Sequence, residues 1–125
     1  MGMGQISSVV TCKPGVRFGG FTAGLCRILS VLVEMAEDGL EGMPPTLVIT
    51  SGSDHHHPPS RHVTFEAIDI RSKTFATVEA KERFRAAYER RLGPQFTVLL
   101  ECLGESNEHF HAQVKKGHTY ISEWE

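Results

Sequence analysis

The chain has 125 residues, of which 40% are apolar, enough for one compact core but not for two, so we expect a single domain over residues 1–125. A formal net charge of -2 without a broad basic face argues against nucleic acid as a partner. The longest apolar stretch, residues 28–33, is too short to cross a bilayer, so no membrane partner is expected.

The amino-terminal half predicts an extended segment, a helix and a strand. The first 20 residues, with several Gly and a Pro, predict an irregular or extended entry. A helix is expected from Thr22, which can cap it, to Gly39, which can end it. Its apolar residues recur at helical spacing: Leu25, Ile28, Leu29, Leu32, Met35 and Ala36. Two prolines then precede a short buried strand over residues 47–49.

A loop and a second strand follow. Residues 51–60 are rich in Ser, His and Pro, which predicts a loop. Residues 65–70 predict a strand in which Ile68 and Ile70 point to one face and Asp69 to the other. Asp69 is therefore expected to point away from the core.

The carboxyl-terminal half predicts one helix and two strands. Residues 77–92 predict an amphipathic helix, and residues 96–101 and 109–114 predict strands. In the last strand His109 and His111 share one face. Two helices and about four strands without regular alternation indicate an α+β domain with a small, mainly antiparallel sheet. The three cysteines are widely separated and odd in number, which indicates buried free thiols.

Histidine and carboxylate side chains predict a metal site of the catalytic kind. The stretches from Ser60 to Asp69 and from Glu108 to His111 supply three possible zinc ligands and at least one further carboxylate. Asp69 and His111 lie in mid-strand between apolar neighbours, and half-buried ionisable groups need a partner such as a divalent metal. A catalytic zinc takes three protein ligands and keeps one open position, whereas a structural zinc is usually closed by four, mostly thiolates.

The same residues carry a family resemblance. Ser60-x-His62-x6-Asp69 and Glu108-x-x-His111 resemble the two zinc motifs of the M15 family of metallopeptidases, which includes D-Ala-D-Ala carboxypeptidases, dipeptidases and related phage endolysins. The core is also similar to the amino-terminal signalling domain of hedgehog proteins. The resemblance covers about residues 47–114 and implies a hedgehog/DD-peptidase-like fold. It further implies that His62, Asp69 and His111 ligate one Zn²⁺ per chain, with water in the fourth position.

The resemblance also implies roles for the neighbouring residues. Zinc would lower the pKa of its water and polarise the scissile carbonyl, while a carboxylate would take the proton. Glu108 is the first choice for that base from the peptidase spacing, and Glu105 is the alternative from the hedgehog spacing. His109 either donates a hydrogen bond to the oxyanion or supports a ligand. His56 resembles a histidine that lines the site in hedgehog domains.

Two positions depart from the peptidase pattern. The Ser-Gly pair at residues 51–52 is not followed by the Arg that holds the substrate carboxylate in the peptidases. Arg61 or Arg71 could take that role, because a guanidinium binds a carboxylate through two parallel hydrogen bonds. Phe65 stands where the motif normally has Gly. The expected substrate-binding residues are Ser60, Arg61, Arg71 and His56.

The ligand triad with an acid at peptidase spacing is what favours the first hypothesis, and the resemblance implies its content: a zinc metallopeptidase that hydrolyses an amide bond in peptidoglycan stem peptides, in the manner of a carboxypeptidase or an endolysin. Such a protein is expected in the cytoplasm, or released without a signal peptide to act on the cell wall. The alternative is a non-catalytic zinc-binding module of the same fold that binds a protein or cell-wall partner. The missing Arg and the Gly that is replaced favour this alternative.

Overall fold

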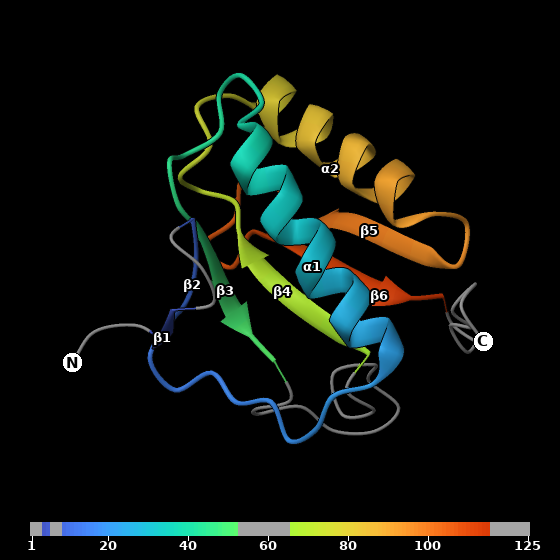
Figure 1. Cartoon of the computed structure of the whole chain (residues 1–125). Helices are drawn as coiled ribbons and strands as arrows, with labels where there is room; N and C mark the ends of the chain where they lie inside the picture. Colours follow the sequence, from blue (N-terminus) through green and yellow to red (C-terminus); the bar gives the residue numbers. More distant parts are fainter. Residues whose placement is uncertain (1–3, 6–8, 53–65, 116–125) are drawn as a thin grey trace.

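A six-stranded sheet with two helices packed on one of its faces forms the described part of the chain, residues 4–5, 9–52 and 66–115, in this computed structural model (Figure 1). The strands are β1 (Gly4–Gln5), β2 (Val10–Cys12), β3 (Leu47–Ser51), β4 (Ala67–Arg71), β5 (Phe96–Glu101) and β6 (His109–Val114). The helices are α1 (Ala23–Asp38) and α2 (Val78–Leu92). The fold is α+β, as the sequence predicts.

The sheet is mixed but mainly antiparallel. Its strand order is β1-β2-β3-β4-β6-β5, and all neighbouring strands are antiparallel except β2 and β3, which are parallel. The prediction of about four strands was too low, because the segment expected to be irregular or extended contributes β1 and β2. Hydrogen bonds from Leu47 N–H to the Val9 carbonyl and from Lys13 N–H to the Ile49 carbonyl, each 2.8 Å, attach β2 to β3. Such pairing across the sheet has no local sequence signal.

Both helices begin and end where the sequence predicts. The Thr22 hydroxyl accepts a hydrogen bond from the Leu25 N–H at 3.1 Å, and the Thr77 hydroxyl accepts one from the Ala80 N–H at 3.0 Å. Gly39 ends α1 in the left-handed conformation with φ 64°, where its N–H bonds the Met35 carbonyl. The expected apolar positions of α1 are all buried or packed against the core.

An aromatic cluster joins α2 to the sheet. The ring centroids of Phe84 on α2 and Phe110 on β6 are 4.9 Å apart, and the ring centroid of Phe75 is 5.1 Å from each of them. Tyr88 continues the cluster, and its hydroxyl donates a 2.7 Å hydrogen bond to the Ile28 carbonyl of α1. Burial raises the pKa of Tyr88 well above its usual value. The two helices and β6 therefore share one core.

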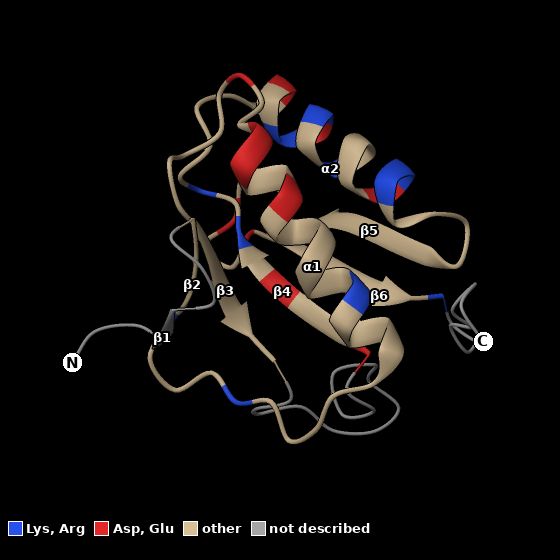
Figure 2. Ribbon diagram, viewed as in Figure 1, with Lys and Arg blue, Asp and Glu red and all other residues tan. Residues whose placement is uncertain are grey.

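The two faces of the sheet differ in chemistry. In β6 the side chains of Phe110, Ala112 and Val114 are fully buried on the helix side, whereas His109, His111 and Gln113 are half-buried on the other side. Charged residues are concentrated on α2 and towards the end of α1, while the strands are mostly uncharged (Figure 2). The few ionisable side chains on the face opposite the helices are therefore exceptions among the mostly uncharged strand residues.

The cysteines test one further expectation. All three cysteines are free thiols, as expected, but only Cys12 is buried; Cys102 is half-buried and Cys26 is exposed. The expectation of burial was wrong for Cys26, which lies on the outer side of α1 in its first turn. Neither α1 nor α2, the helices that the structure describes, has the length and apolar character needed to cross a membrane.

Candidate functional site

Asp69 and His111 lie directly opposite each other on the neighbouring strands β4 and β6. The Nδ1 atom of His111 is 2.9 Å from the Oδ1 atom of Asp69, and its Nε2 atom is 2.6 Å from the Oε1 atom of Gln113. The side chains of His111 and Asp69 are only 13% and 14% exposed. The expectation that both point away from the helix side is confirmed, and their register brings them into contact.

The environment of His111 favours a charged ring. Burial works against a positive charge on the imidazole, but the hydrogen bonds to Asp69 and Gln113 and the nearby carboxylates outweigh burial and raise the pKa of His111. A ring with two acceptors, one on each nitrogen, is held in a fixed orientation. The Gln113 oxygen contacts the second ring nitrogen, and metal-ligating histidines usually have a hydrogen-bond partner at that nitrogen.

His109 lies on the same face of the sheet as His111, two residues before it on β6. Its Nδ1 atom is 2.6 Å from the Asn107 carbonyl, and its Nε2 atom is 3.0 Å from the Glu101 carboxylate and 3.8 Å from that of Asp69. Arg71, His109 and Glu101 lie opposite one another on β4, β6 and β5. Glu101 was missed by the sequence reasoning. The alternation of β5 places Glu101 on this face, but only the register of β5 against β6 places it beside His109.

Glu108 is directed to the opposite side of the sheet from the two histidines. It is 7% exposed, and its carboxylate accepts hydrogen bonds from the Ser72 hydroxyl and, at 2.9 Å, from the Gly104 N–H. Lys81 on α2 forms an ion pair with the same carboxylate at 2.7 Å. Burial alone would raise the pKa of Glu108, but these three partners outweigh it and lower the pKa to about 2. Such contacts favour a structural role for Glu108.

Glu105, the alternative base, lies in the turn between β5 and β6. It is exposed, and its N–H donates to the Cys102 carbonyl while its own carbonyl accepts from the Glu108 N–H. Cys102 starts this turn with φ 55°, a conformation that residues other than Gly rarely adopt. The Glu105 carboxylate is therefore not held by a buried ion pair and hydrogen bonds in the way that the Glu108 carboxylate is.

Several expected site residues lie outside the described residues. These are His56, Ser60, Arg61 and His62, together with Phe65. The expectations for these five residues stay predictions. Asp69, Arg71, Glu105, Glu108, His109 and His111 are the expected site residues that the structure describes.

The Asp69–His111 pair suits zinc as part of a ligand set. Imidazole nitrogen and carboxylate oxygen are both zinc donors, and three protein ligands of these types occur in catalytic sites. Within residues 4–5, 9–52 and 66–115, no group of three or more His, Cys, Asp or Glu could hold a metal. The pair would therefore supply two ligands, and the expected third, His62, lies outside the described residues.

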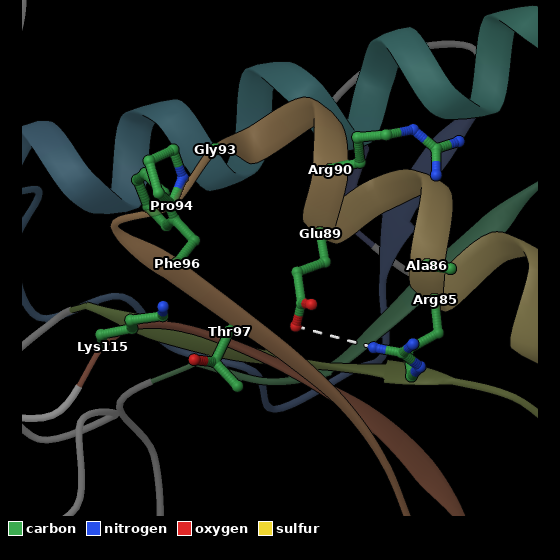
Figure 3. Close-up of a pocket in the computed structure, with 9 residues that line it drawn as sticks. All are labelled: Arg85, Ala86, Glu89, Arg90, Gly93, Pro94, Phe96, Thr97 and Lys115. Atoms are coloured by element: carbon green, nitrogen blue, oxygen red, sulfur yellow. Dashed lines mark ion pairs between the residues drawn. The ribbon is translucent and has the colours of Figure 1, made fainter.

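Among the described residues, two of the cavities lie on different parts of the structure. One, of about 380 Å³, includes Asp69 and His109 in its wall. The other, of about 630 Å³, lies between α2 and β5 and is lined by residues such as Glu89, Arg90 and Lys115 (Figure 3). The larger cavity contains none of the expected site residues. The smaller one is therefore the candidate substrate cavity.

Comparison with known proteins adds no relative. The chain matches no protein-family model, no curated protein and no solved structure. The resemblance to metallopeptidases therefore stands on the motif residues alone. The face that holds Asp69, His109 and His111 is the candidate functional site.

Proposed function

We propose that the protein is a zinc-dependent metallopeptidase with a hedgehog/DD-peptidase-like fold, which hydrolyses an amide bond in peptidoglycan stem peptides. The observation that carries the proposal is the direct contact of Asp69 with His111 on the face opposite the helices. Two donors that zinc prefers converge there from different strands, at the positions that the M15-like motifs give to ligands. His62 completes the proposed ligand set.

The described residues would share the work as follows. Zinc, when bound, would supply a Lewis acid and a water of lowered pKa. Asp69 and His111 would hold the ion, and Gln113 would fix the orientation of the His111 ring. His109, whose Nδ1 contacts the Asn107 carbonyl, would exchange the contact of its Nε2 with Glu101 for a hydrogen bond donated to the oxyanion that develops on the substrate.

The contacts of Glu108 count against it as the base. Glu108 would have to leave Ser72, Lys81 and the Gly104 N–H before it could take a proton, and a carboxylate with a pKa of about 2 is a weak base. We therefore favour Glu105 as the base. In Glu105→Gln, turnover should fall by on the order of 10²- to 10⁴-fold, with zinc still bound.

The second candidate function is a non-catalytic zinc-binding module that recognises a protein or cell-wall partner. The structural contacts of Glu108, the carboxylate at peptidase spacing, favour it. Stoichiometric zinc without hydrolysis of any muropeptide would select this function over the peptidase.

The test combines metal analysis with a digest. Protein prepared without nickel is analysed for metal, and muropeptides are digested with and without chelator and examined by mass spectrometry. We expect one zinc per chain and chelator-sensitive cleavage of one type of amide bond. His111→Ala should lose the zinc, whereas His109→Ala, a matched change on the same strand and face, should keep it and lose roughly 10²- to 10³-fold in turnover. Protein without zinc, or zinc retained in His111→Ala, would contradict the proposed centre.

A further inference from the structure

The larger cavity, between α2 and β5, has more cationic than anionic side chains in its wall. Its lining residues include three cations, Arg85, Arg90 and Lys115, and one carboxylate, Glu89. That carboxylate is already engaged, because it accepts the Val98 N–H at 2.9 Å and lies 3.6 Å from the Arg85 guanidinium. Among the described residues, no second carboxylate lines this cavity to balance Arg90 and Lys115.

Arg90 is the cation of this wall that is available to a partner. It is exposed near the end of α2, and its guanidinium makes no ion pair or hydrogen bond within the part of the chain that the structure describes. In Figure 3 the guanidinium points away from Lys115, but an exposed side chain changes rotamer within nanoseconds. Arg90 can therefore turn toward a negatively charged group in the cavity.

The rest of the wall suits an aromatic side chain. Ala86 on α2, together with Gly93 and Pro94 that follow this helix, provides apolar surface, and Thr97 on β5 adds a hydroxyl (Figure 3). The cavity has a volume of about 630 Å³. Ligand cavities usually measure about 300–1,000 Å³, so this one has room for a large side chain. A partner that carries both negative charge and an aromatic ring would match this wall.

The chain leaves the sheet at this cavity. Lys115 follows β6 directly, and its N–H donates a 2.8 Å hydrogen bond to the Gln95 carbonyl, just before β5. Lys115 also lines the cavity. The residues that come next in the sequence therefore begin at the cavity wall.

Those next residues have the composition that the wall would match. Residues 116–125 lie outside the described residues, and their sequence places a glutamate on each side of a tryptophan: Glu123, Trp124 and Glu125. Each residue of an extended chain spans about 3.3–3.6 Å, so this segment is long enough to reach any part of the cavity from Lys115. Gly117 allows the chain to turn near the start of the segment.

We propose that the segment 120–125 docks in this cavity of the same molecule, with Trp124 on the apolar wall and the two flanking carboxylates beside Arg90 and Lys115. Attachment at the cavity wall gives the segment an effective concentration of about 1 mM or more. Two exposed ion pairs and one aromatic contact, each weak on its own, are then sufficient to hold it. The cavity contains none of the expected site residues, so docking there is independent of any peptidase activity.

Trp124 is the single tryptophan of the chain, so its fluorescence reports docking directly. The full chain and a free peptide of residues 116–125 are compared by emission maximum and by acrylamide quenching. We expect emission at a shorter wavelength in the full chain, and a quenching constant about two-fold lower than that of the peptide, or lower still. In about 1 M NaCl, where charges are screened beyond about 3 Å, both differences should shrink. Equal emission and equal quenching of chain and peptide would overturn the proposal.

Charge reversals locate the contacts. Arg90→Glu/Lys115→Glu should raise the quenching constant nearly to that of the free peptide. Arg83→Glu/Lys13→Glu changes the net charge equally at exposed positions outside this cavity, and it should leave the quenching constant unchanged. Protection of Trp124 that survives the reversal in the cavity, or that the control removes as well, would contradict docking at this site.

A charge swap tests the pairing itself. Glu123→Lys/Glu125→Lys alone should lose the protection of Trp124. Combined with Arg90→Glu/Lys115→Glu it should regain the protection, because the same pairs form with the opposite sign. If the combined variant is quenched as strongly as the free peptide, the proposed pairing is wrong.

Dilution separates docking within one molecule from docking on a second copy. The quenching constant should stay the same across a series of protein concentrations, because contact within one chain does not depend on concentration. Protection that appears only at high protein concentration would place the segment on a second copy and overturn the proposal.

Discussion

Glu108 occupies the position just before β6, and the first residue of that strand, His109, faces the other side of the sheet. The alternation of a strand directs His109 and His111 to one face and Glu108, like Phe110, to the helix side. There a charged carboxylate requires partners, and Lys81, Ser72 and the Gly104 N–H provide them. A residue at peptidase spacing from a ligand therefore helps to hold α2 and the β5–β6 turn together.

The Glu108 contacts predict how stability depends on pH. Because the folded pKa of about 2 lies below the usual value of 4.5, the stabilisation by Glu108 is complete above about pH 4.5 and is lost as the pH falls towards 2. Glu108→Gln should lower the free energy of unfolding near pH 7 by about 2 to 3 kcal/mol, since a charged group with buried partners is lost. Denaturant unfolding of both proteins between pH 2 and 7 measures the difference.

Glu105→Gln, an exposed change in the same turn, should alter stability by less than about 0.5 kcal/mol. If Glu108→Gln keeps the acid-dependent loss of the unmodified protein, the ion pair with Lys81 is not the cause.

At the scale of elements, β5 lies at one edge of the described sheet and α2 protects it. The Glu89 carboxylate accepts a hydrogen bond from the Val98 N–H at 2.9 Å, and the Arg85 guanidinium donates one to the Val98 carbonyl at 3.0 Å. Glu89 and Arg85 also lie 3.6 Å apart as an ion pair (Figure 3). The two side chains occupy the backbone groups with which a further strand would pair.

Removing this protection should favour self-association. In the Arg85→Ala/Glu89→Ala variant the Val98 N–H and carbonyl are free at the edge, so dimers or larger aggregates should form at lower protein concentration. Light scattering across a concentration series measures the change. Glu79→Ala/Arg90→Ala, a change of equal net charge on the same helix, should behave like the unmodified protein. Equal association of both variants would attribute the effect to lost charge rather than to the edge.

For the molecule as a whole, Phe110 connects the core to the candidate site. It is fully buried against Phe75 and Phe84, and it lies in β6 between the two histidines. The aromatic cluster therefore fixes the strand that presents His111 to Asp69. The core and the proposed metal centre are two faces of the same strand.

Phe110→Ala should destabilise the whole domain. Loss of a buried Phe side chain costs about 3 to 5 kcal/mol, because the apolar contacts are lost and a cavity remains. Denaturant unfolding followed by circular dichroism measures the change. Leu99→Ala on β5, where Leu99 is 42% exposed, is the control and should cost about 1 kcal/mol or less. A similar cost for both variants would mean that the cluster does not hold β6 in place.

Local patterns in the sequence determined the positions of both helices and of most strands, and the side of the sheet to which the strand residues point. The capping residues Thr22 and Thr77 and the apolar spacing placed both helices, and alternation placed Asp69 and His111 on the side away from the core. The bounds of β5 and β6 agree with the prediction as well. These features depend on residues a few positions apart, so the sequence alone can show them.

Only the tertiary structure decided which side chains meet. Register brought Asp69 opposite His111 and Glu101 beside His109, and packing of α2 brought Lys81 to Glu108. The pairing of β2 with β3 also placed Lys13 in the wall of the same cavity as Arg71. The physical reason is that these contacts join segments distant in the chain, and the free energy that selects them belongs to the packed core rather than to any local pattern.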